Sequence, residues 1–264
     1  MSAAPVTTAP VSTAPVVLVT GAAGGIGRAV VTAFVEAGYD VAAVDVRRDE
    51  SLTALGTGSR QVVPYAVDVT DDPAVAALAT DVERDFGRLD SLALVAGINQ
   101  GAAPVEQMVP EDFRRVLDVN LVGPYLLCHH LVPLLRRDGG GTIGAVSSFW
   151  ARSGHAYFGA YCASKAGLLL YVQSLADELA PDIRVNSVCP GNIDTRMHRD
   201  ALESEAAERG ISVQEMQDIE WGKIPLAAAG APSVIADALV FLASERASYI
   251  TGASLDVNGG VVFH

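Results

Sequence analysis

The chain has 264 residues, of which 50% are hydrophobic, and this is enough apolar side chain to fill the core of one large domain. Its 18 basic and 31 acidic side chains leave a net charge of −13, and such a surface repels phosphate backbones and anionic lipids, so we discount nucleic acid and membranes as partners. We find no uninterrupted apolar run of about 18 residues that would predict a membrane-spanning helix.

The N-terminal stretch is rich in Ala, Pro, Thr and Val and lacks the basic start and continuous apolar run of a signal peptide. We expect a disordered tail over residues 1–15, followed by a single domain over residues 16–264. The three cysteines, Cys128, Cys162 and Cys189, show no CxxC or Cys/His ligand spacing. We therefore expect no metal site, and reduced cysteines in the core of a cytoplasmic protein.

Short β-branched runs alternate with helical patterns from residue 16 onward, which is typical of a parallel sheet covered by helices on both faces. The expected strands are apolar on both faces, as buried parallel strands are. They span residues 16–20, 41–45, 62–67, 91–95, 142–147, 183–189 and 254–257. The expected helices span residues 26–36, 73–86, 111–135, 159–179 and 233–243. The fold class is therefore α/β, a doubly wound, mostly parallel, seven-stranded Rossmann-like sheet.

A polar stretch over residues 192–222 interrupts this alternation before the last helix. Its helical composition and Gly210 predict an insertion over the edge of the sheet, which we interpret as a substrate lid.

The turn between the first strand and its helix reads Thr-Gly-Ala-Ala-Gly-Gly-Ile-Gly over residues 20–27. Glycines let a backbone turn sharply and approach a ligand, and free N–H groups at a helix start attract a pyrophosphate. Such a turn can also be purely structural, but its place after the first strand favours a dinucleotide site. The candidate cofactor-binding residues here are Gly21, Gly25, Ile26 and Gly27.

Two acids follow later strands. Asp45 lies 24 residues after Gly21, close to the offset of an acid that accepts hydrogen bonds from an adenine ribose, although a strand-end acid can also be a solvated loop residue. Asp68, followed by Val69, stands where it could meet the adenine, or it could cap the next helix. Asp45 favours NAD over NADP, whereas Arg47 and Arg48 could accommodate a 2′-phosphate.

Tyr161 and Lys165 are four residues apart within the helical pattern of residues 159–179, so both emerge on one face. An ammonium beside a phenol stabilises the phenolate, and we expect Lys165 to lower the pKa of Tyr161. Ser148, 13 residues before Tyr161, ends the fifth strand, with Ser147 adjacent. Asn120 interrupts an apolar helical stretch, where it could simply bond to a backbone carbonyl. These four are the candidate catalytic residues.

Together these residues resemble the short-chain dehydrogenase/reductase family in its single-domain form. The resemblance covers residues 16–260 through the Gly-rich turn, Asp68-Val69, Asn120, the Ser148 and Tyr161-x-x-x-Lys165 set, Pro190-Gly191 with Thr195, Tyr249-Ile250-Thr251-Gly252, and Asn258-Gly259-Gly260.

The resemblance implies roles for these residues. Ser148 would hold the substrate oxygen, Tyr161 would exchange its proton, Lys165 would bind the nicotinamide ribose, and Asn120 would hold a proton-relaying water. The resemblance also implies that the nicotinamide is flanked by Pro190, Gly191 and Thr195.

One motif departs from the family, which usually has Asn-Asn-Ala-Gly after the fourth strand, whereas this chain has Leu94-Val95-Ala96-Gly97. Backbone contacts of Ala96 and Gly97 to the cofactor could survive the change. The side-chain hydrogen bonds of the missing asparagines could not, and Asn99 is a candidate for a partial substitute.

The expected activity is an NAD-dependent interconversion of a secondary alcohol and a ketone on a polyol, a hydroxy acid or a cyclic diol. The candidate substrate residues are Trp150, His155, Asn192 and Met197. Other aromatic residues that could line the pocket, or belong to the core or an interface, are Phe149, Tyr157, Phe158 and Trp221. The alternative is a dinucleotide-binding sensor or scaffold without turnover. The apolar excess of residues 111–135 and 159–179, including Leu168 to Tyr171, predicts a homotetramer or homodimer.

Overall fold

A computed structural model describes residues 12–263 of the chain. Most of the expected tail therefore lies outside the described residues. Its last part is packed onto the domain, because the Ser12 N–H donates to the Phe86 carbonyl at 2.8 Å and the Ser12 hydroxyl to Asp40 at 2.6 Å. Ala14 is buried. Within the described residues, contacts with the domain are thus already present at Ser12 and Ala14, before Val16.

Seven parallel strands form one sheet in the order β3-β2-β1-β4-β5-β6-β7. They are β1 Val16–Thr20, β2 Asp40–Asp45, β3 Val62–Ala66, β4 Ser91–Leu94, β5 Gly141–Val146, β6 Ile183–Pro190 and β7 Ser254–Val257. The direction of winding reverses between β1 and β4, and ligands of such sheets bind at the carboxyl ends of the strands near this point. The doubly wound α/β prediction is confirmed.

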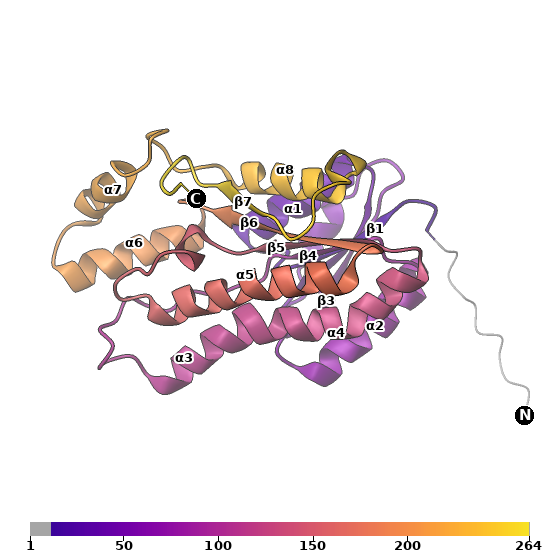
Figure 1. The fold of residues 1–264 in the computed structure, drawn as a ribbon, viewed down its shortest axis with the longest axis horizontal. Helices are drawn as coiled ribbons and strands as arrows, with labels where there is room; N and C mark the ends of the chain where they lie inside the picture. The colour runs from indigo at the N-terminus through magenta and orange to yellow at the C-terminus, as the bar shows by residue number, and fades with distance from the viewer. Residues whose placement is uncertain (1–11, 264) are drawn as a thin grey trace, which may run out of the picture.

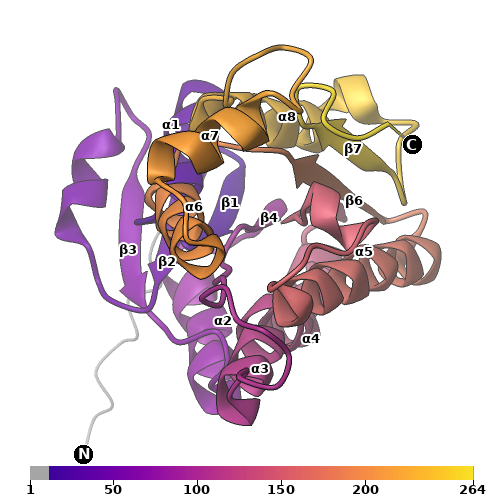
Figure 2. The same cartoon turned by 90° about the vertical axis from the view of Figure 1, so that its left-hand side faces the viewer.

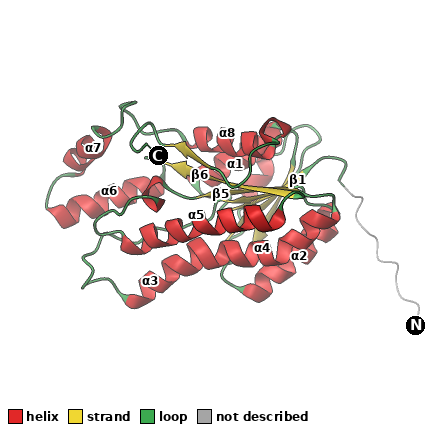
Figure 3. Cartoon of the chain, viewed as in Figure 1, coloured by secondary structure: helices red, strands yellow, loops and turns green. Residues whose placement is uncertain are grey.

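Helices cover both faces of the sheet, as Figures 1 and 3 show. The α-helices are α1 Gly25–Glu36, α2 Asp72–Phe86, α3 Pro110–Leu117, α4 Gly123–Arg137, α5 Gly159–Leu179, α6 Arg196–Arg209, α7 Val213–Trp221 and α8 Pro232–Ala243. Short 3₁₀ turns cover η1 Glu50–Leu55, η3 Phe149–Ala151 and η4 Glu245–Ala247. Among residues 12–263, no helix is long and apolar enough to cross a bilayer.

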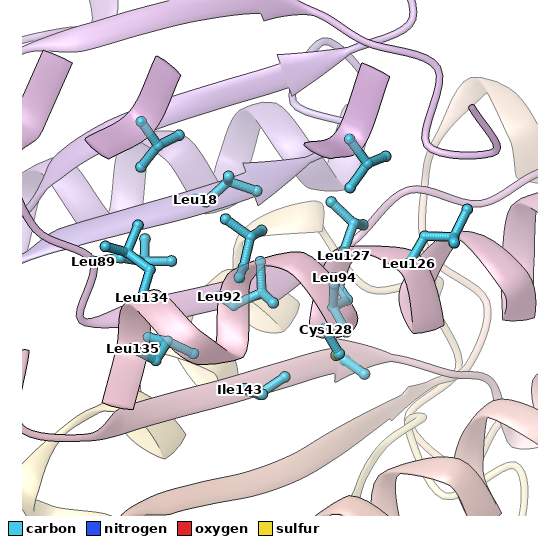
Figure 4. Packing of buried hydrophobic residues seen from close by; sticks show 14 of the residues in the cluster. Leu18, Leu89, Leu92, Leu94, Leu126, Leu127, Cys128, Leu134, Leu135 and Ile143 are labelled. Carbon is cyan, nitrogen blue, oxygen red and sulfur yellow. The ribbon is translucent and has the colours of Figure 1, made fainter. Parts of the chain in front are cut away.

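Two apolar layers hold the sheet between the helices. On the face of α2, α4 and α5, leucines from strands and helices interdigitate, among them Leu18, Leu92, Leu127 and Leu134 (Figure 4). On the other face α1 and α8 pack together over the same strands. The cysteines Cys128, Cys162 and Cys189 are buried and unpaired.

The long helix expected over residues 111–135 is wrong in one respect, because α3 and α4 are joined by a π-helical turn, η2 Asp118–Val122. Pro124 has no N–H to donate to the carbonyl of Asn120 four residues earlier. The Gly123 N–H donates instead to the Asp118 carbonyl, five residues back. Asn120 lies in this widened turn, and such turns recur at functional sites.

The segment interpreted as a lid forms α6 and α7, which stand in front of one end of the sheet (Figure 2). The two helices pack on each other through a small apolar cluster of their own, Leu202, Ala206 and Met216. A capping box between Ser212 and Glu215 starts α7.

Candidate active site

A cleft opens at the carboxyl ends of β4, β5 and β6, beside the N-terminal part of α6. Most of the residues predicted to act on cofactor or substrate line it together. They are Ile26, Gly97, Ser148, Trp150, Tyr161, Lys165, Pro190, Gly191, Asn192, Thr195 and Met197. The sheet topology therefore brings together residues that are far apart in the sequence, as expected for a ligand site at the switch point.

The glycine turn has a backbone that other residues would not tolerate. Gly21 has a φ of 64°, and a Cβ there would lie 2.8 Å from the Ala96 Cα. A Cβ on Gly27 would lie 1.9 Å from the Gly21 carbonyl oxygen, and one on Gly25 would lie 3.0 Å from the Thr195 side chain. The helix start at Gly24 has no side-chain cap, so its first N–H groups remain available to an anion.

Asp45 is fixed against this turn. One of its carboxylate oxygens accepts the Ala23 N–H at 3.0 Å, and the other accepts the Val46 N–H at 2.8 Å. Arg48 pairs with Glu50, two residues later in the chain, at 2.5 Å. Arg47 is exposed.

Asp68 does not cap the following helix, so that interpretation is wrong. Asp71 is the N-cap of α2 and accepts the Ala74 N–H at 3.1 Å. The Asp68 carboxylate instead accepts both the N–H and the hydroxyl of Thr70, at 2.9 and 2.7 Å, and these bonds lower its pKa. Val69 is buried and packs against Gly123. A Cβ added to Gly123 would lie 2.8 Å from a methyl group of Val69.

Tyr161, Ser148 and Lys165 meet at the floor of the cleft. A hydrogen bond with Ser148 favours ionisation of the Tyr161 phenol, but burial is the larger effect and raises the pKa of Tyr161 to about 12. The Lys165 ammonium lies 5.8 Å from the centroid of the Tyr161 ring and donates to the Val146 carbonyl at 2.8 Å. Burial lowers the pKa of Lys165 to about 8.

The expected lowering of the Tyr161 pKa by Lys165 is therefore not found in this structure. Desolvation disfavours both the phenolate and the ammonium, so each group is shifted toward its neutral form.

Asn120 is fully buried and uses both ends of its carboxamide. Its oxygen accepts the Ile98 N–H at 2.8 Å, and its nitrogen donates to the Ile98 carbonyl at 2.9 Å and to Ser164 at 3.0 Å. The backbone bonding considered from sequence is thus present. A Cβ on Gly97 would lie 3.2 Å from both the Asn120 oxygen and the Lys165 ammonium, which places the three side by side.

The turn after β4 is supported by Thr20, a residue that sequence reasoning missed. Its hydroxyl oxygen accepts the N–H groups of Val95 and Ala96 at 3.0 and 3.1 Å. The expected substitute, Asn99, accepts only the N–H of Gln100 and lines the cleft, so its assignment as support for the turn is wrong. The hydroxyl at the end of β1 was the available signal.

Gln100 is a second missed residue. It is buried, accepts the Tyr161 N–H at 2.8 Å and donates to the Tyr157 carbonyl at 3.0 Å. This side chain thereby holds the first turn of α5, which carries Tyr161. A single glutamine after a strand gave no pattern from which to infer this role.

The substrate candidates divide into two groups. Trp150, Asn192 and Met197 line the cleft with Phe149, whereas His155, Tyr157, Phe158 and Trp221 do not. His155 lies behind Trp150, stacked on its indole with ring centroids 4.1 Å apart, and its Nε2 lies 3.2 Å from a Glu205 oxygen. The assignment of His155 to the pocket wall is wrong because the indole separates it from the cleft.

Helix α6 contributes more of the wall than we expected. His198 and Ala201 line the cleft beside Met197. Residues three and four apart on a helix share a face, so this spacing was the missed signal. Burial lowers the pKa of His198, which keeps its imidazole neutral.

Comparison with known proteins extends this description. The model of a family described as enoyl-(acyl carrier protein) reductase matches residues 21–262. The chain is similar to the 3-oxoacyl-[acyl-carrier-protein] reductase FabG of Thermotoga maritima, at 36% identity over 94% of this chain and 97% of that protein. It is similar to the L-fucose dehydrogenase of Oryctolagus cuniculus, at 37% identity over 93% and 84% of the two chains.

Among solved structures, the chain is similar to an NAD+-bound xylitol dehydrogenase, with a TM-score of 0.90 and 30% identity. The similarity covers 93% of this chain and 98% of that one.

Proposed function

The chain belongs to the short-chain dehydrogenase/reductase family, and from that membership we propose that it is an NAD-dependent oxidoreductase that interconverts a secondary alcohol and a ketone. The observation that carries the proposal is the convergence of Ser148, Tyr161 and Lys165 in one cleft with the glycine turn of α1. The relatives named as fucose and xylitol dehydrogenases support a small polar or cyclic substrate.

The residues present fit a nicotinamide dinucleotide. Gly21 and Gly27 allow the tight turn that a side chain would block, the uncapped start of α1 offers N–H groups to a pyrophosphate, and Asp45 stands at the end of β2. When bound, the nicotinamide would supply or accept the hydride. Lys165, Pro190, Gly191 and Thr195 would hold its ring and ribose, and Ala96 and Gly97 would contact it through their backbones.

The chain's own residues account for the proton. Ser148 would hold the substrate oxygen while the Tyr161 hydroxyl transfers its proton to that oxygen as the ketone is reduced, and takes it back as the alcohol is oxidised. Burial keeps the phenol protonated, which suits the reductive direction. Asn120 would place a water between Lys165 and solvent.

Asp45 supports a preference for NAD. The carboxylate would accept hydrogen bonds from the ribose hydroxyls of NAD and would repel the 2′-phosphate of NADP. Its bonds to Ala23 and Val46 hold it in place for either role.

We also propose that the chain forms a homotetramer or homodimer in the cytoplasm. Large side chains are exposed on the outer helices, among them Tyr125 on α4 and Leu170 on α5. A second copy of the chain would cover them. Residues 192–222, which form α6 and α7, would act as the lid over the substrate.

The test is a screen of secondary alcohols and ketones with NAD and NADP, followed through the absorbance of the reduced nicotinamide. Turnover that Tyr161→Phe abolishes would support the proposal. Binding of the cofactor without turnover of any alcohol or ketone would favour a dinucleotide sensor.

A further inference from the structure

Asn192 is a buried polar residue in the cleft whose side chain the fold does not use. It follows Pro190 and Gly191 at the end of β6, is 8% exposed and lines the cleft together with Ser148 and Tyr161. Its Nδ2 atom is buried without a hydrogen-bond partner. Most buried amide groups find partners, so an unpaired N–H on a residue that lines a cleft indicates a bond to an oxygen of the bound ligand.

The backbone around Asn192 is held rigidly. The Gly191 N–H donates to the Val257 carbonyl at 3.0 Å, and the Asn192 carbonyl accepts the Gly230 N–H at 2.8 Å. A Cβ on Gly191 would lie 2.7 Å from the backbone of Asn258. The segment therefore cannot easily shift to give the amide another partner within the protein.

The charges around the cleft indicate that this ligand oxygen is uncharged. Among the described residues, Lys165 is the one ammonium or guanidinium that lines the cleft, and it donates to the Val146 carbonyl. Five cations, one in the turn after β5 and four in and just after the segment of α6 and α7, are paired with carboxylates. These pairs are Arg152 with Asp256, Arg196 with Asp200, Arg199 with Asp194, Arg209 with Glu205, and Lys223 with Glu220.

An anionic substrate would thus meet paired cations and a chain of net charge −13. A carboxylate or phosphate needs a charged or multiply donating partner when it leaves water. A neutral hydroxyl oxygen can accept from a single donor, and the Asn192 Nδ2 is an unpaired donor.

We propose that Asn192 is a specificity-determining residue that donates to a second, uncharged oxygen of the substrate. The favoured substrates are then neutral polyols or cyclic diols and their hydroxyketones, rather than hydroxy acids or phosphate-bearing thioesters of coenzyme A. This inference rests on the proposed alcohol dehydrogenase function and narrows its substrate class. The neutral imidazole of His198 and the apolar Trp150 and Met197 complete a wall suited to such molecules.

The test compares two neutral substrates that differ by one hydroxyl, a vicinal cyclohexanediol and cyclohexanol, in wild type, Asn192→Leu and Asn192→Asp. Wild type should favour the diol by roughly tenfold or more in kcat/KM, because a site built to hydrogen-bond a hydroxyl rejects an analogue without one. Asn192→Leu should lose that preference because its kcat/KM falls for the diol and stays unchanged for cyclohexanol. Asn192→Asp, which removes the donor and adds a charge, should lose it too.

Two controls separate the explanations. Gln61→Leu removes an exposed amide from the loop before β3, away from the cleft, and should change neither substrate. Affinity for NADH, followed by its fluorescence, should be the same in wild type and Asn192→Leu. Equal losses with both substrates, a weakened NADH complex in Asn192→Leu, or a wild-type preference for hydroxy acids would each overturn the inference.

Calorimetry of diol binding to the NADH complex tests the contact without turnover. If no alcohol is turned over but the diol binds in wild type and not in Asn192→Leu, the proposed dehydrogenase function fails and the Asn192 contact stands. If turnover is normal and the diol binds equally well to wild type and Asn192→Leu, the proposed Asn192 contact is wrong and the dehydrogenase function stands.

Discussion

The imidazole of His155 lies nearly parallel to the indole of Trp150, with an angle of 12° between the rings. The Nε2 atom of His155 meets Glu205 of α6, a buried carboxylate that also pairs with Arg209. The proposed lid helix is thus joined through His155 to the indole that lines the cleft.

We predict that His155→Ala weakens substrate binding without abolishing chemistry. An aromatic pair contributes about 0.5–1.5 kcal/mol, so KM should rise about two- to tenfold while kcat stays near wild type. Steady-state kinetics measure both constants. His130→Ala, which removes a histidine paired with Asp72, is the control. A fall in kcat with unchanged KM would contradict this role for His155.

Tyr161→Phe should lose about 10²- to 10⁴-fold in kcat, because it removes the atom that carries the proton. Cofactor binding should stay nearly unchanged, since the ring remains in place. Single-turnover absorbance and NADH fluorescence measure the two effects. Turnover within about tenfold of wild type would remove Tyr161 from the mechanism.

The raised pKa of Tyr161 predicts opposite pH profiles for the two directions. Alcohol oxidation needs the phenolate, which is scarce well below a pKa of about 12. Its kcat/KM should therefore rise about tenfold per pH unit between about pH 7 and about pH 10. Ketone reduction needs the phenol, which stays protonated, so its Tyr161-dependent rate should be flat over that range. A plateau of oxidation already at neutral pH would show that bound cofactor lowers this pKa.

Asp45→Ala should change the choice of cofactor. Wild type should prefer NAD over NADP by more than about a hundredfold, since a like charge beside a confined phosphate costs several kcal/mol. Asp45→Ala should lower the NAD/NADP ratio of catalytic efficiencies, because NAD binds more weakly and the 2′-phosphate of NADP is no longer repelled. The ratio of catalytic efficiencies is the measurement. If wild type prefers NADP, or if the ratio does not move, Arg47 and Arg48 must be reconsidered as selectors.

Leu170→Glu should dissociate the proposed oligomer. Leu170 is 63% exposed on α5, and a carboxylate placed in an apolar interface loses its hydration without gaining a partner. Sedimentation velocity at micromolar concentration should show a smaller species than wild type. Val105→Glu, at a position that is 90% exposed, is the matched control and should leave the assembly intact. A monomeric wild type would refute the assembly itself.

The strongly periodic elements could be predicted from sequence almost to the residue. The expected bounds of β1, α5 and β7 agree with the structure, and those of the other strands differ by at most one residue at each end. These elements have uniform apolar patterns whose period identifies them. The π-helical turn at Asn120 was not predictable in this way, because the same apolar stretch fits a regular helix.

The site was predictable as a set of residues but less so as a geometry. Ser148 and Lys165 converge because strand order dictates it. The position of His155 behind Trp150 depends on the path of a loop, and the pKa of Tyr161 depends on burial that three-dimensional packing alone decides. Gln100 and Thr20 support the site through hydrogen bonds to distant backbone N–H groups, and no local sequence pattern predicts such bonds.

The π turn at η2 separates two registers within one continuous helical segment. A surplus residue rotates the later turns of the helix by about 100° relative to a regular α-helix. Asn120 can therefore face Ile98 while Leu127 and Leu131 still face the sheet. Deleting a single residue from this turn would leave the local sequence helical but would put either the amide or the leucines on the wrong side. The extra residue of the turn thus sets the orientation of the later helical turns separately from that of Asn120, so the same segment can serve both the cleft and the core.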